Sequence, residues 1–342
     1  MAAVAPVAAP PAAPSRDDRT TPTPSIGADG RRAALAVAIM TDETGWHTRQ
    51  LQAALRARGA LGRCIDLADC RIDTTHAWHG LAIPGFGREL PDAVLVRGIA
   101  GGTFEQVTKR LGVLHALREL GVPVYNDARA IERSVDKSMT SLLLHGAGIP
   151  TPPTWATESV GEARRIVMRE AAAGHALVLK PLFGSQGKGL LRIGSIDGVL
   201  QPLPELDGVY GGLAYLQRFV PPTASPGFDW RVLVVGGHAV TAMRRVSANW
   251  VHNVAQGARC EPARLTNELA QTAERAAAAL EMDYAGVDLM PSASGIQVIE
   301  VNGVAAWQGL QRVTRFNIAR ALVDDLLDRK WAAGRTTLRR QA

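Results

Sequence analysis

Residues 175–193, HALVLKPLFGSQGKGLLRI, combine two apolar runs with a glycine-rich segment between them. The first run ends at Lys180 and the second begins at Leu190; apolar runs of this length bounded by glycine are typical of strands. Glycines let the backbone approach a ligand closely, and successive backbone N–H groups form a nest for anions. The stretch therefore predicts a strand, a phosphate-binding loop and a second strand, with Lys180 able to reach phosphate oxygens.

The glycine-rich loop, GSQGKG at residues 184–189, leaves a second interpretation open. It does not match the Walker pattern, which closes in Gly-Lys-Ser/Thr, and no helix opens after its last glycine as the dinucleotide pattern requires. An ordinary hairpin turn would also explain the glycines. The lysine just upstream favours phosphate binding.

Residues 285–302, AGVDLMPSASGIQVIEVN, predict a hairpin that carries three oxygen-bearing side chains. Glu300 and Asn302 are two residues apart on one strand, so their side chains leave the same face. A three-residue loop at 293–295, with Gly295 in the left-handed conformation, would place Asp288 opposite Glu300. Carboxylate and amide oxygens suit Mg²⁺ that is bound with the help of substrate phosphates. The hairpin predicts a metal site, and an exposed polar face is the alternative.

Asp136-Lys137-Ser138 opens a predicted helix. Asp136 is a candidate N-cap, and the helix dipole favours an anion near this end. Lys137 could therefore point at a bound phosphate. A capped helix with a solvated lysine is the alternative.

A second group of charges lies on two predicted strands, with Asp229 and Arg231 on one and Arg244-Arg245 on the next. An ion pair within the first strand explains Asp229 and Arg231. A clamp for carboxylate or phosphate explains the arginines as well, because a guanidinium matches those anions in a bidentate way.

The chain upstream of these motifs alternates strands and helices. Strands are predicted at 33–40, 59–67, 92–97 and 122–125, and helices at 47–58 and 103–120. This alternation favours an α/β arrangement, an open and mainly parallel sheet with helices on its faces.

Downstream of residue 126 the predicted elements change to helices and antiparallel strands. Helices are predicted at 128–133, 136–145, 158–173, 264–280 and 312–327, and strands at 214–220, 229–235, 238–246, 285–290 and 296–301. Gly236-Gly237 is a strong hairpin signal between two of these strands.

Composition excludes several classes of protein. With 46% hydrophobic and 20% charged residues, the 342-residue chain is neither collagen-like, coiled-coil nor wholly disordered. The net charge of +6 comes from scattered residues, which gives a nucleic-acid role little support and suits small anionic ligands. Three cysteines without Cys-x-x-Cys spacing fit a reducing cytoplasm. The apolar run at 33–40 is far shorter than the ~18 residues of a membrane span.

Covalent catalysis by a protein nucleophile is not indicated. There is no Gly-x-Ser-x-Gly elbow and no Cys/His pairing, and the eight histidines show no metal-ligand grouping.

Seven short motifs in order resemble the ATP-grasp ligases, and in particular the RimK-type glutamate ligases. They are DKSMTSLLLHGAGIPTPPT, LVLKPLFGSQGKGL, YLQRFV, DWRVLVVGGHAV, HNVAQGA, AGVDLM and IEVN, between Asp136 and Asn302. The resemblance implies two α+β subdomains that grip ATP, preceded by a Rossmann-like domain with an open parallel sheet. The expected limits are a disordered Ala/Pro-rich tail at 1–32, the Rossmann-like domain at 33–126, the central or lid subdomain at 127–202, the C-terminal subdomain at 203–330 and a basic tail at 331–342.

The resemblance also implies roles for residues at matching positions. Phosphate contacts fall to Lys137, Lys180 and the loop residues Gly184, Ser185, Gln186 and Gly187. The adenine-contacting hinge would be Gln217, Arg218 and Phe219, with Asp229 at the ribose. Arg231, Arg245 and Asn253 would face the γ-phosphate and the acceptor carboxylate, and Asp288, Glu300 and Asn302 would hold Mg²⁺, with Mn²⁺ as an alternative metal.

Three departures from the family pattern bear on the substrate. Arg218 stands where the hinge commonly has Glu, Arg244 stands where the family commonly has Glu, and GVAAWQGLQ replaces Ser-Pro-Gly after Asn302. The last segment is more similar to relatives that add glutamate to pterin-type one-carbon carriers or deazaflavin cofactors.

The resemblance thus predicts an ATP-dependent carboxylate-amine ligase that adds an amino acid, L-glutamate, to a small anionic cofactor precursor such as a methanopterin-like C1 carrier. A glutamate ligase acting on a ribosomal protein or peptide C-terminus, an ATP-binding protein without turnover and a nucleic-acid binder are the alternatives. We expect small-molecule partners, no membrane, and a possible homo-oligomer.

Overall fold

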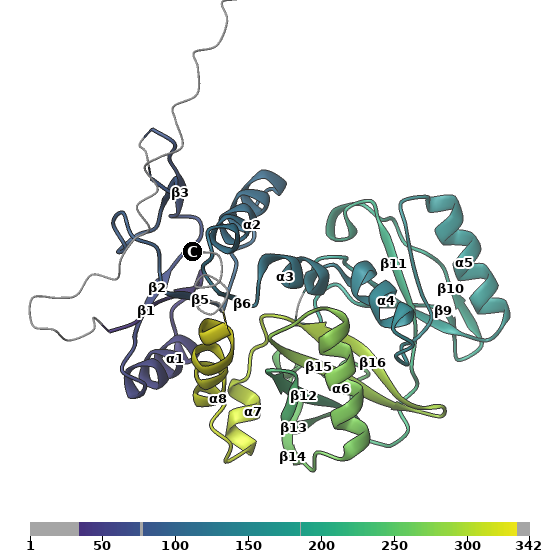
Figure 1. Ribbon diagram of the computed structural model, residues 1–342. Helices are drawn as coiled ribbons and strands as arrows, with labels where there is room; N and C mark the ends of the chain where they lie inside the picture. Colours follow the sequence, from purple (N-terminus) through teal and green to yellow (C-terminus); the bar gives the residue numbers. More distant parts are fainter. Residues whose placement is uncertain (1–33, 76–77, 185, 334–342) are drawn as a thin grey trace, which may run out of the picture. The chain divides into compact units, whose positions relative to one another are not determined.

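The computed structural model describes residues 34–75, 78–184 and 186–333. The tail predicted at 1–32 lies outside these residues, as does most of the tail predicted at 331–342. Three main sheets and their helices make up the described chain (Figure 1).

The first sheet is parallel and has the order β2-β1-β5-β6. Its strands are β1 (Ala36–Met40), β2 (Leu61–Ile65), β5 (Ala93–Val96) and β6 (Val124–Tyr125). Apolar side chains leave alternate faces of β1 and β5, so each face has its own buried core. Helix α1 (Trp46–Ala57) covers one face and α2 (Phe104–Glu119) the other. The predicted open parallel sheet is confirmed.

The connection between β2 and β5 contains a small hairpin that the sequence pattern did not indicate. It is formed by β3 (Arg71–Ile72) and β4 (Leu81–Ala82). With two residues in each strand, it is too short to show the alternation that predicts strands.

The second sheet is antiparallel and has the order β10-β9-β8-β11-β7. Its strands are β7 (Thr154–Thr157), β8 (Ala176–Lys180), β9 (Leu191–Ile196), β10 (Val199–Gln201) and β11 (Ala214–Arg218). Helix α5 (Val160–Ala172) packs Ala163, Ile166 and Val167 against it. Because β11 belongs to this sheet, the sheet extends past residue 202. The predicted domain limits stay predictions, and we propose that the central subdomain ends after β11.

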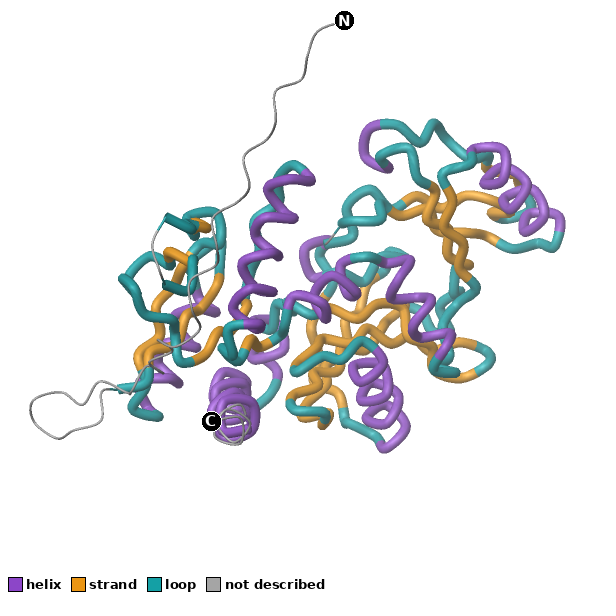
Figure 2. The backbone as a smooth tube through the Cα atoms, turned by 45° about the horizontal axis from the view of Figure 1, so that its top comes forward, coloured by secondary structure: helices purple, strands orange, loops and turns teal. Residues whose placement is uncertain are grey.

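The third sheet has the order β14-β13-β12-β15-β16. Its strands are β12 (Gly227–Val235), β13 (His238–Ser247), β14 (Arg259–Ala263), β15 (Tyr284–Ser292) and β16 (Gly295–Asn302), and α6 (Asn267–Ala279) packs on one face. Gly236 and Gly237 have φ angles of 58° and 84°, as a tight turn between β12 and β13 requires. Figure 2 shows helices lying outside the sheets.

Two helices, α3 (Ala128–Val135) and α4 (Lys137–Gly146), connect the first sheet to the second. The short 3₁₀ turns η1 (Gly208–Tyr210) and η2 (Val254–Gln256) each join strands within one sheet, the second and the third respectively. Asp136 ends α3 and caps α4, and its Oδ1 accepts hydrogen bonds from the backbone N–H groups of Ser138 (2.8 Å) and Met139 (3.1 Å). The predicted N-cap is confirmed.

The prediction of one closing helix at 312–327 is wrong in one respect, because this part of the chain forms two separate helices. They are α7 (Gln308–Val313) and α8 (Ile318–Asp325), and α8 continues as a π-helical segment (Leu326–Trp331). Thr314 is extended, and the Asn317 side chain accepts a hydrogen bond from the N–H of Arg320. A capping asparagine therefore starts a new helix where the apolar periodicity appears continuous.

Asn126 joins the first sheet to the third. It is fully buried, and its Nδ2 donates to the carbonyl oxygens of Tyr284 and Gly303, each at 2.7 Å. Its Oδ1 accepts from the N–H groups of Asp283 (2.6 Å) and Tyr284 (3.0 Å). One amide thus holds the start of β15 and the residue that follows β16.

Candidate active site

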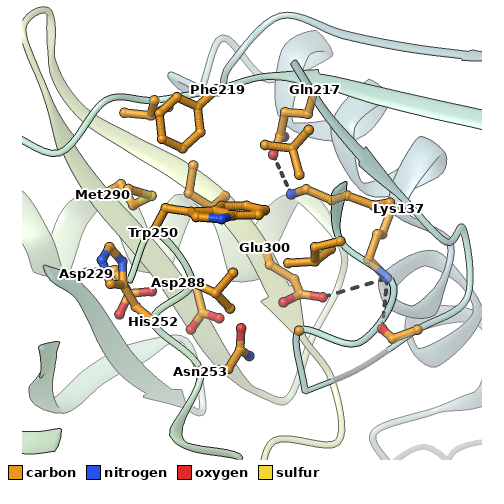
Figure 3. A pocket seen from close by; sticks show the side chains of 18 of the residues that line it. Lys137, Gln217, Phe219, Asp229, Trp250, His252, Asn253, Asp288, Met290 and Glu300 are labelled. Carbon is orange, nitrogen blue, oxygen red and sulfur yellow. Dashed lines mark hydrogen bonds and ion pairs between the residues drawn. The ribbon is translucent and has the colours of Figure 1, made fainter. Parts of the chain in front are cut away.

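A pocket lies between the second and third sheets, and most of the predicted site residues line it (Figure 3). Charged groups come from α4, β8, β12, β13, β15 and β16. The apolar lining includes Val178, Leu190, Phe219, Val220, Trp250, Met290 and Ile299. A pocket with apolar walls and a few convergent charges fits a ligand that has a flat apolar part and an anionic part.

Asp288 pairs directly with Glu300 across the β15–β16 hairpin, as predicted. The loop is shorter than predicted, because Ser292 pairs with Gly295 and only residues 293–294 lie between them. A bulge at Ile299 restores the pairing, since Leu289 pairs with Val298 and Asp288 with Glu300. Gly295 has φ 106°, in the region that favours glycine.

The carboxylate of Asp288 is held by two arginines. The Nε and Nη2 atoms of Arg231 donate to its two oxygens, each at 2.7 Å, and Nη2 of Arg245 lies 3.0 Å from Oδ2. Arg245 also donates to Asp229, with 2.7 Å between Nε and Oδ1. Asp288, Asp229 and Arg245 are all buried. The four side chains form one network of alternating charge.

These contacts correct the predicted ion pair between Asp229 and Arg231. Side chains two apart on a strand share a face but stand farther apart than directly paired side chains. The register pairs Asp229 with Arg245 and Arg231 with Asp288, so each acid meets an arginine on a neighbouring strand.

The network separates the pKa values of its two carboxyls. Burial would raise the pKa of Asp288, but Arg231 and Arg245 lower it below its ordinary value. Burial raises the pKa of Asp229 to about 6 against the attraction of Arg245, and the negative charge of Asp288 contributes to the rise. Asp229 is therefore the carboxyl that takes up a proton first.

Lys180 ends β8 inside the pocket and is 9% exposed. Its Nζ donates to Oε1 of Gln217 at 2.6 Å, and the Gln217 side chain reaches Thr154 in turn. Burial lowers the pKa of Lys180 to about 8, although Glu300 acts in the opposite direction. No ion pair of Lys180 occurs among the described residues, so its charge is available to an anionic ligand.

Lys137 holds the glycine-rich loop. Its Nζ donates to the carbonyl oxygens of Leu182 (3.2 Å) and Gly184 (2.8 Å) and lies 3.9 Å from Oε1 of Glu300. Burial lowers the pKa of Lys137, and Glu300 opposes this shift. The lysine thus connects the loop to the acidic hairpin.

The loop packs closely on the segment that follows β13. Gly187 has φ 71°, and a Cβ at this position would lie 2.8 Å from Oδ1 of Asn253 and 2.9 Å from Cγ1 of Val251. Nε2 of Gln256 donates to the carbonyl oxygen of Gln186 at 3.2 Å. A side chain at residue 187 would be strained by the positive φ and would have to displace Asn253 and Val251, so this position favours glycine.

The structure brings together all of the described site residues that the sequence predicts, except two. Arg231 donates to Asp288 without lining the pocket, and Asn302, also outside the lining, donates through Nδ2 to the carbonyl oxygen of Gly286 at 3.2 Å. Arg218 lines the pocket, but its guanidinium binds Glu170. Ser185 lies outside the described residues.

Several lining residues were missed by the sequence analysis. Val178 and Met290 share their strand faces with Lys180 and Asp288, so the two-residue alternation of a strand could have identified them. Trp250 and His252 come from a loop and gave no periodic signal. His252, to which the sequence analysis assigned no role, lines the pocket, and its Nε2 faces Gly227, where a Cβ would lie 2.9 Å away.

The donor atoms at the acidic hairpin fit Mg²⁺. Glu300 is 28% exposed and has only the long Lys137 contact, and Asn302 uses its Nδ2 and leaves its oxygen without a partner among the described residues. Asp288 adds carboxylate oxygens, although both already accept from arginine. No group of three His, Cys, Asp or Glu side chains suited to a metal occurs in the described part of the chain. Such a donor set matches a metal that keeps waters and phosphate oxygens as its other ligands.

Comparison with known families defines the class. Residues 134–326 match the RimK-like ATP-grasp domain and residues 35–131 match the RimK PreATP-grasp domain. The fold is that of an ATP-grasp ligase. The chain belongs to the RimK-like ATP-grasp family, which confirms the predicted fold, family and ligase class.

Curated relatives carry glutamate ligase names. The tetrahydromethanopterin:alpha-L-glutamate ligase of Methanocaldococcus jannaschii is 36% identical over 240 residues, which is 69% of this chain and 79% of the relative. That of Methanosarcina acetivorans is 30% identical over 330 residues, 85% of this chain and 98% of the relative. A probable alpha-L-glutamate ligase of Maridesulfovibrio salexigens is 29% identical over 281 residues, 82% of this chain and 90% of the relative.

Solved structures share the fold. The ATP-grasp ligase PsnB, complexed with a phosphomimetic variant of its minimal precursor, Mg and ADP, has a TM-score of 0.64 and 22% identity, covering 86% of this chain and 98% of PsnB. A RimK domain ATP-grasp protein from Sphaerobacter thermophilus has a TM-score of 0.59 and 21% identity, covering 85% and 99%. No described helix has the length and hydrophobicity needed to cross a bilayer.

Proposed function

We propose that this ligase joins L-glutamate to a carboxylate of a small anionic cofactor precursor, a methanopterin-like C1 carrier. The observation that carries the proposal is the pocket in which Lys137 and Lys180 face the Asp288–Glu300 pair, in a chain 36% identical to a relative named for this reaction. The overall reaction joins the acceptor carboxylate to the amine of L-glutamate as an amide and converts ATP to ADP and phosphate.

The proposed chemistry has two steps. A carboxylate oxygen of the acceptor attacks the γ-phosphorus of ATP, the bond to the bridging oxygen breaks, and ADP leaves. The glutamate amine then attacks the acyl carbon, the carbon–oxygen bond to phosphate breaks, and the amine loses a proton. No protein nucleophile takes part. Positioning and charge neutralisation therefore have to supply the rate enhancement.

The pocket residues divide between the parts of the nucleotide. We place the adenine against the apolar side chains near Phe219, Trp250 and Met290, and the phosphates at Lys137 and Lys180. Gln217 to Phe219 would supply the hinge, and the loop at 184–189 would cover the phosphates. Asp229, which lines the pocket, reaches the ribose in this proposal.

Asp288, Glu300 and Asn302 would hold Mg²⁺, which when bound neutralises charge on the phosphates. We propose that Mn²⁺ can replace it. Arg245 and Asn253 line the pocket near these groups, whereas the guanidinium of Arg231 hydrogen-bonds to Asp288 outside the lining and is a positioning residue that fixes this carboxylate. A homo-oligomeric state stays a prediction.

The test is an acceptor screen with the full chain, ATP, Mg²⁺ and L-glutamate. Tetrahydromethanopterin and a peptide ending in glutamate serve as the two acceptors, and mass spectrometry detects an added glutamyl residue. Glutamylation of the pterin alone supports the proposal, and glutamylation of the peptide alone replaces it with the peptide ligase. ATP binding without acceptor-dependent ADP release would identify a binding protein without turnover.

A further inference from the structure

Arg97 lies at the point where the strand order of the first sheet reverses. The chain passes from β1 to β2 on one side of β1, whereas β5 lies on the other side. In open parallel sheets, ligands bind outside the carboxyl ends of the strands at such a switch point. Arg97 directly follows β5, and the N–H groups of Arg97 and Gly98 both donate to the carbonyl oxygen of Met40 at the end of β1.

The Arg97 guanidinium is poorly satisfied by the protein. Within the described part of the chain, its one side-chain hydrogen bond runs from Nη1 to the carbonyl oxygen of Val304 at a long 3.4 Å, and its buried Nε has no partner. It forms no ion pair with any described carboxylate. Asp42, on the neighbouring loop, packs against Gly98 instead. Partly buried guanidinium groups normally have a counter-charge or several acceptors.

Arg110 provides an internal comparison on the same part of the domain. It is 8% exposed, and its Nη1 donates to the carbonyl oxygens of Ala100 (2.7 Å) and Gly101 (3.0 Å). These are ordinary hydrogen-bond lengths, so Arg110 has the contacts of an arginine that fixes a loop. Arg97 lacks such contacts.

The Arg97 side chain faces the end of the strand that carries the acidic site. Val304 is the second residue after Asn302 on the same chain segment. Tyr284, at the start of β15, donates its hydroxyl to the carbonyl oxygen of Val96 at 2.7 Å and so fixes the end of β5 beside this segment. Glu300 and Val304 are separated by at most ~14 Å of extended chain.

His47 lies near Arg97 at the carboxyl ends of the strands but does not add a second positive charge there. Nε2 of His47 accepts a hydrogen bond from the N–H of Trp307 at 3.2 Å, which requires an unprotonated nitrogen. Burial, helped by Arg97, lowers the pKa of His47 to about 4. His47 is therefore neutral near pH 7.

We propose that Arg97 binds a carboxylate of the ligation substrates other than the carboxylate that reacts. The inference rests on the proposed function, because L-glutamate brings two carboxylates to the site and neither is the group that ATP activates. A glutamate-like acceptor likewise keeps a second carboxylate. Both sources present the same anion, and a planar guanidinium recognises it through two parallel hydrogen bonds.

Steady-state kinetics of Arg97→Ala, Arg97→Lys and the matched control Arg49→Ala test the proposal. Arg49 lies on the exposed surface of α1 in the same domain. Arg97→Ala should raise either the KM for L-glutamate or the KM for tetrahydromethanopterin about 10- to 100-fold, as loss of a charge-assisted hydrogen bond does. The KM for ATP and the thermal midpoint should stay near those of the wild type. The substrate whose KM rises identifies the source of the carboxylate.

Arg97→Lys should recover part of the loss, since it keeps the charge without the planar fork. Unchanged KM values for both carboxylate substrates in Arg97→Ala would overturn the proposal. An equal rise in the KM for ATP, or a lowered thermal midpoint with unchanged affinities, would assign Arg97 a structural role tied to Val304 and would also overturn it.

A binding experiment tests this inference independently of the proposed function. Calorimetric titration of L-glutamate and of glutarate into the full chain with ADP and Mg²⁺ needs no turnover. If no acceptor is ever glutamylated, binding to the wild type and to Arg49→Ala that is lost in Arg97→Ala still supports a carboxylate site at Arg97. Equal binding to Arg97→Ala, or no binding to the wild type, contradicts it.

Discussion

Arg231 and Asp288 face one another across β12 and β15 and share two hydrogen bonds of 2.7 Å. Asp288 also pairs directly with Glu300 on β16. Asp288 is therefore fixed from one side by a guanidinium while it presents its strand face to the pocket. The hydrogen bonds from Arg231 thus orient the Asp288 carboxylate in the absence of a ligand.

The first prediction concerns this ion pair. Arg231→Met leaves Asp288 buried with one arginine instead of two, so the free energy of unfolding should fall by about 3 kcal/mol, as for broken buried pairs. Urea unfolding measures the change. Arg165→Ala, which breaks an exposed pair with Glu162, is the control and should cost less than about 1 kcal/mol. Similar losses in the two variants would show that the Arg231 pair contributes little.

The second prediction concerns Glu300. Glu300→Gln keeps the side-chain volume and removes a carboxylate whose one ion pair with a described residue is the 3.9 Å contact with Lys137. We expect acceptor-dependent ADP release to fall by about 10²- to 10⁴-fold, the effect of losing several kcal/mol of metal-assisted charge neutralisation. The thermal midpoint should stay near that of the wild type. Glu281→Gln, at an exposed site paired with Arg133, is the control, and near-normal turnover in Glu300→Gln would remove the metal assignment.

The third prediction concerns the glycine-rich loop. Gly187→Ala would strain a residue at φ 71° and push the loop away from Asn253 and Val251, so the KM for ATP should rise about tenfold. Gly198→Ala is a matched control, because its φ is 79° but a Cβ there meets nothing within 4 Å. If both variants bind ATP like the wild type, the close packing at residue 187 does not matter for the nucleotide.

The fourth prediction concerns the pH dependence of stability. The pKa of Lys180 is lowered to about 8 in the folded chain, below its unfolded value of about 10.4. Between these values the unfolded state binds the extra proton, so stability rises with pH, and Lys180 should contribute about 2 kcal/mol of increase between about pH 8 and about pH 10. This contribution should be absent in Lys180→Met. Denaturant unfolding of both proteins across this range gives the difference, and parallel curves would contradict the shifted pKa.

Much of the fold could be predicted because local patterns and tertiary structure agree. The first sheet follows from apolar runs separated by periodic helices, and the Gly236-Gly237 turn from the need for positive φ. The hairpin shows a partial success. The opposition of Asp288 and Glu300 was predicted from a three-residue loop, but a two-residue loop and a bulge at Ile299 produce it. Bulges leave no trace in the alternation of residue types that could fix their position.

Other features depend on register between distant strands and could not be predicted. The partners of Asp229 and Arg231 are set by β13 and β15, which the local pattern of β12 does not specify. The edge strand β14 contains Pro262, which argues against a strand except at an edge. The sequence pattern did not identify Arg97, because Arg97 belongs to no motif and stands out only by the few hydrogen bonds that its guanidinium makes with described residues.

The four hydrogen bonds of Asn126 hold the acidic hairpin at its open end, close to Asp283, Tyr284 and Gly303. At the opposite end, no other element of the described chain donates or accepts a hydrogen bond at the turn, and residues 293–295 are exposed. The carboxylates are thus located by the root of the hairpin. Its tip is a place where a tag or a short foreign peptide can be grafted while the catalytic geometry is kept.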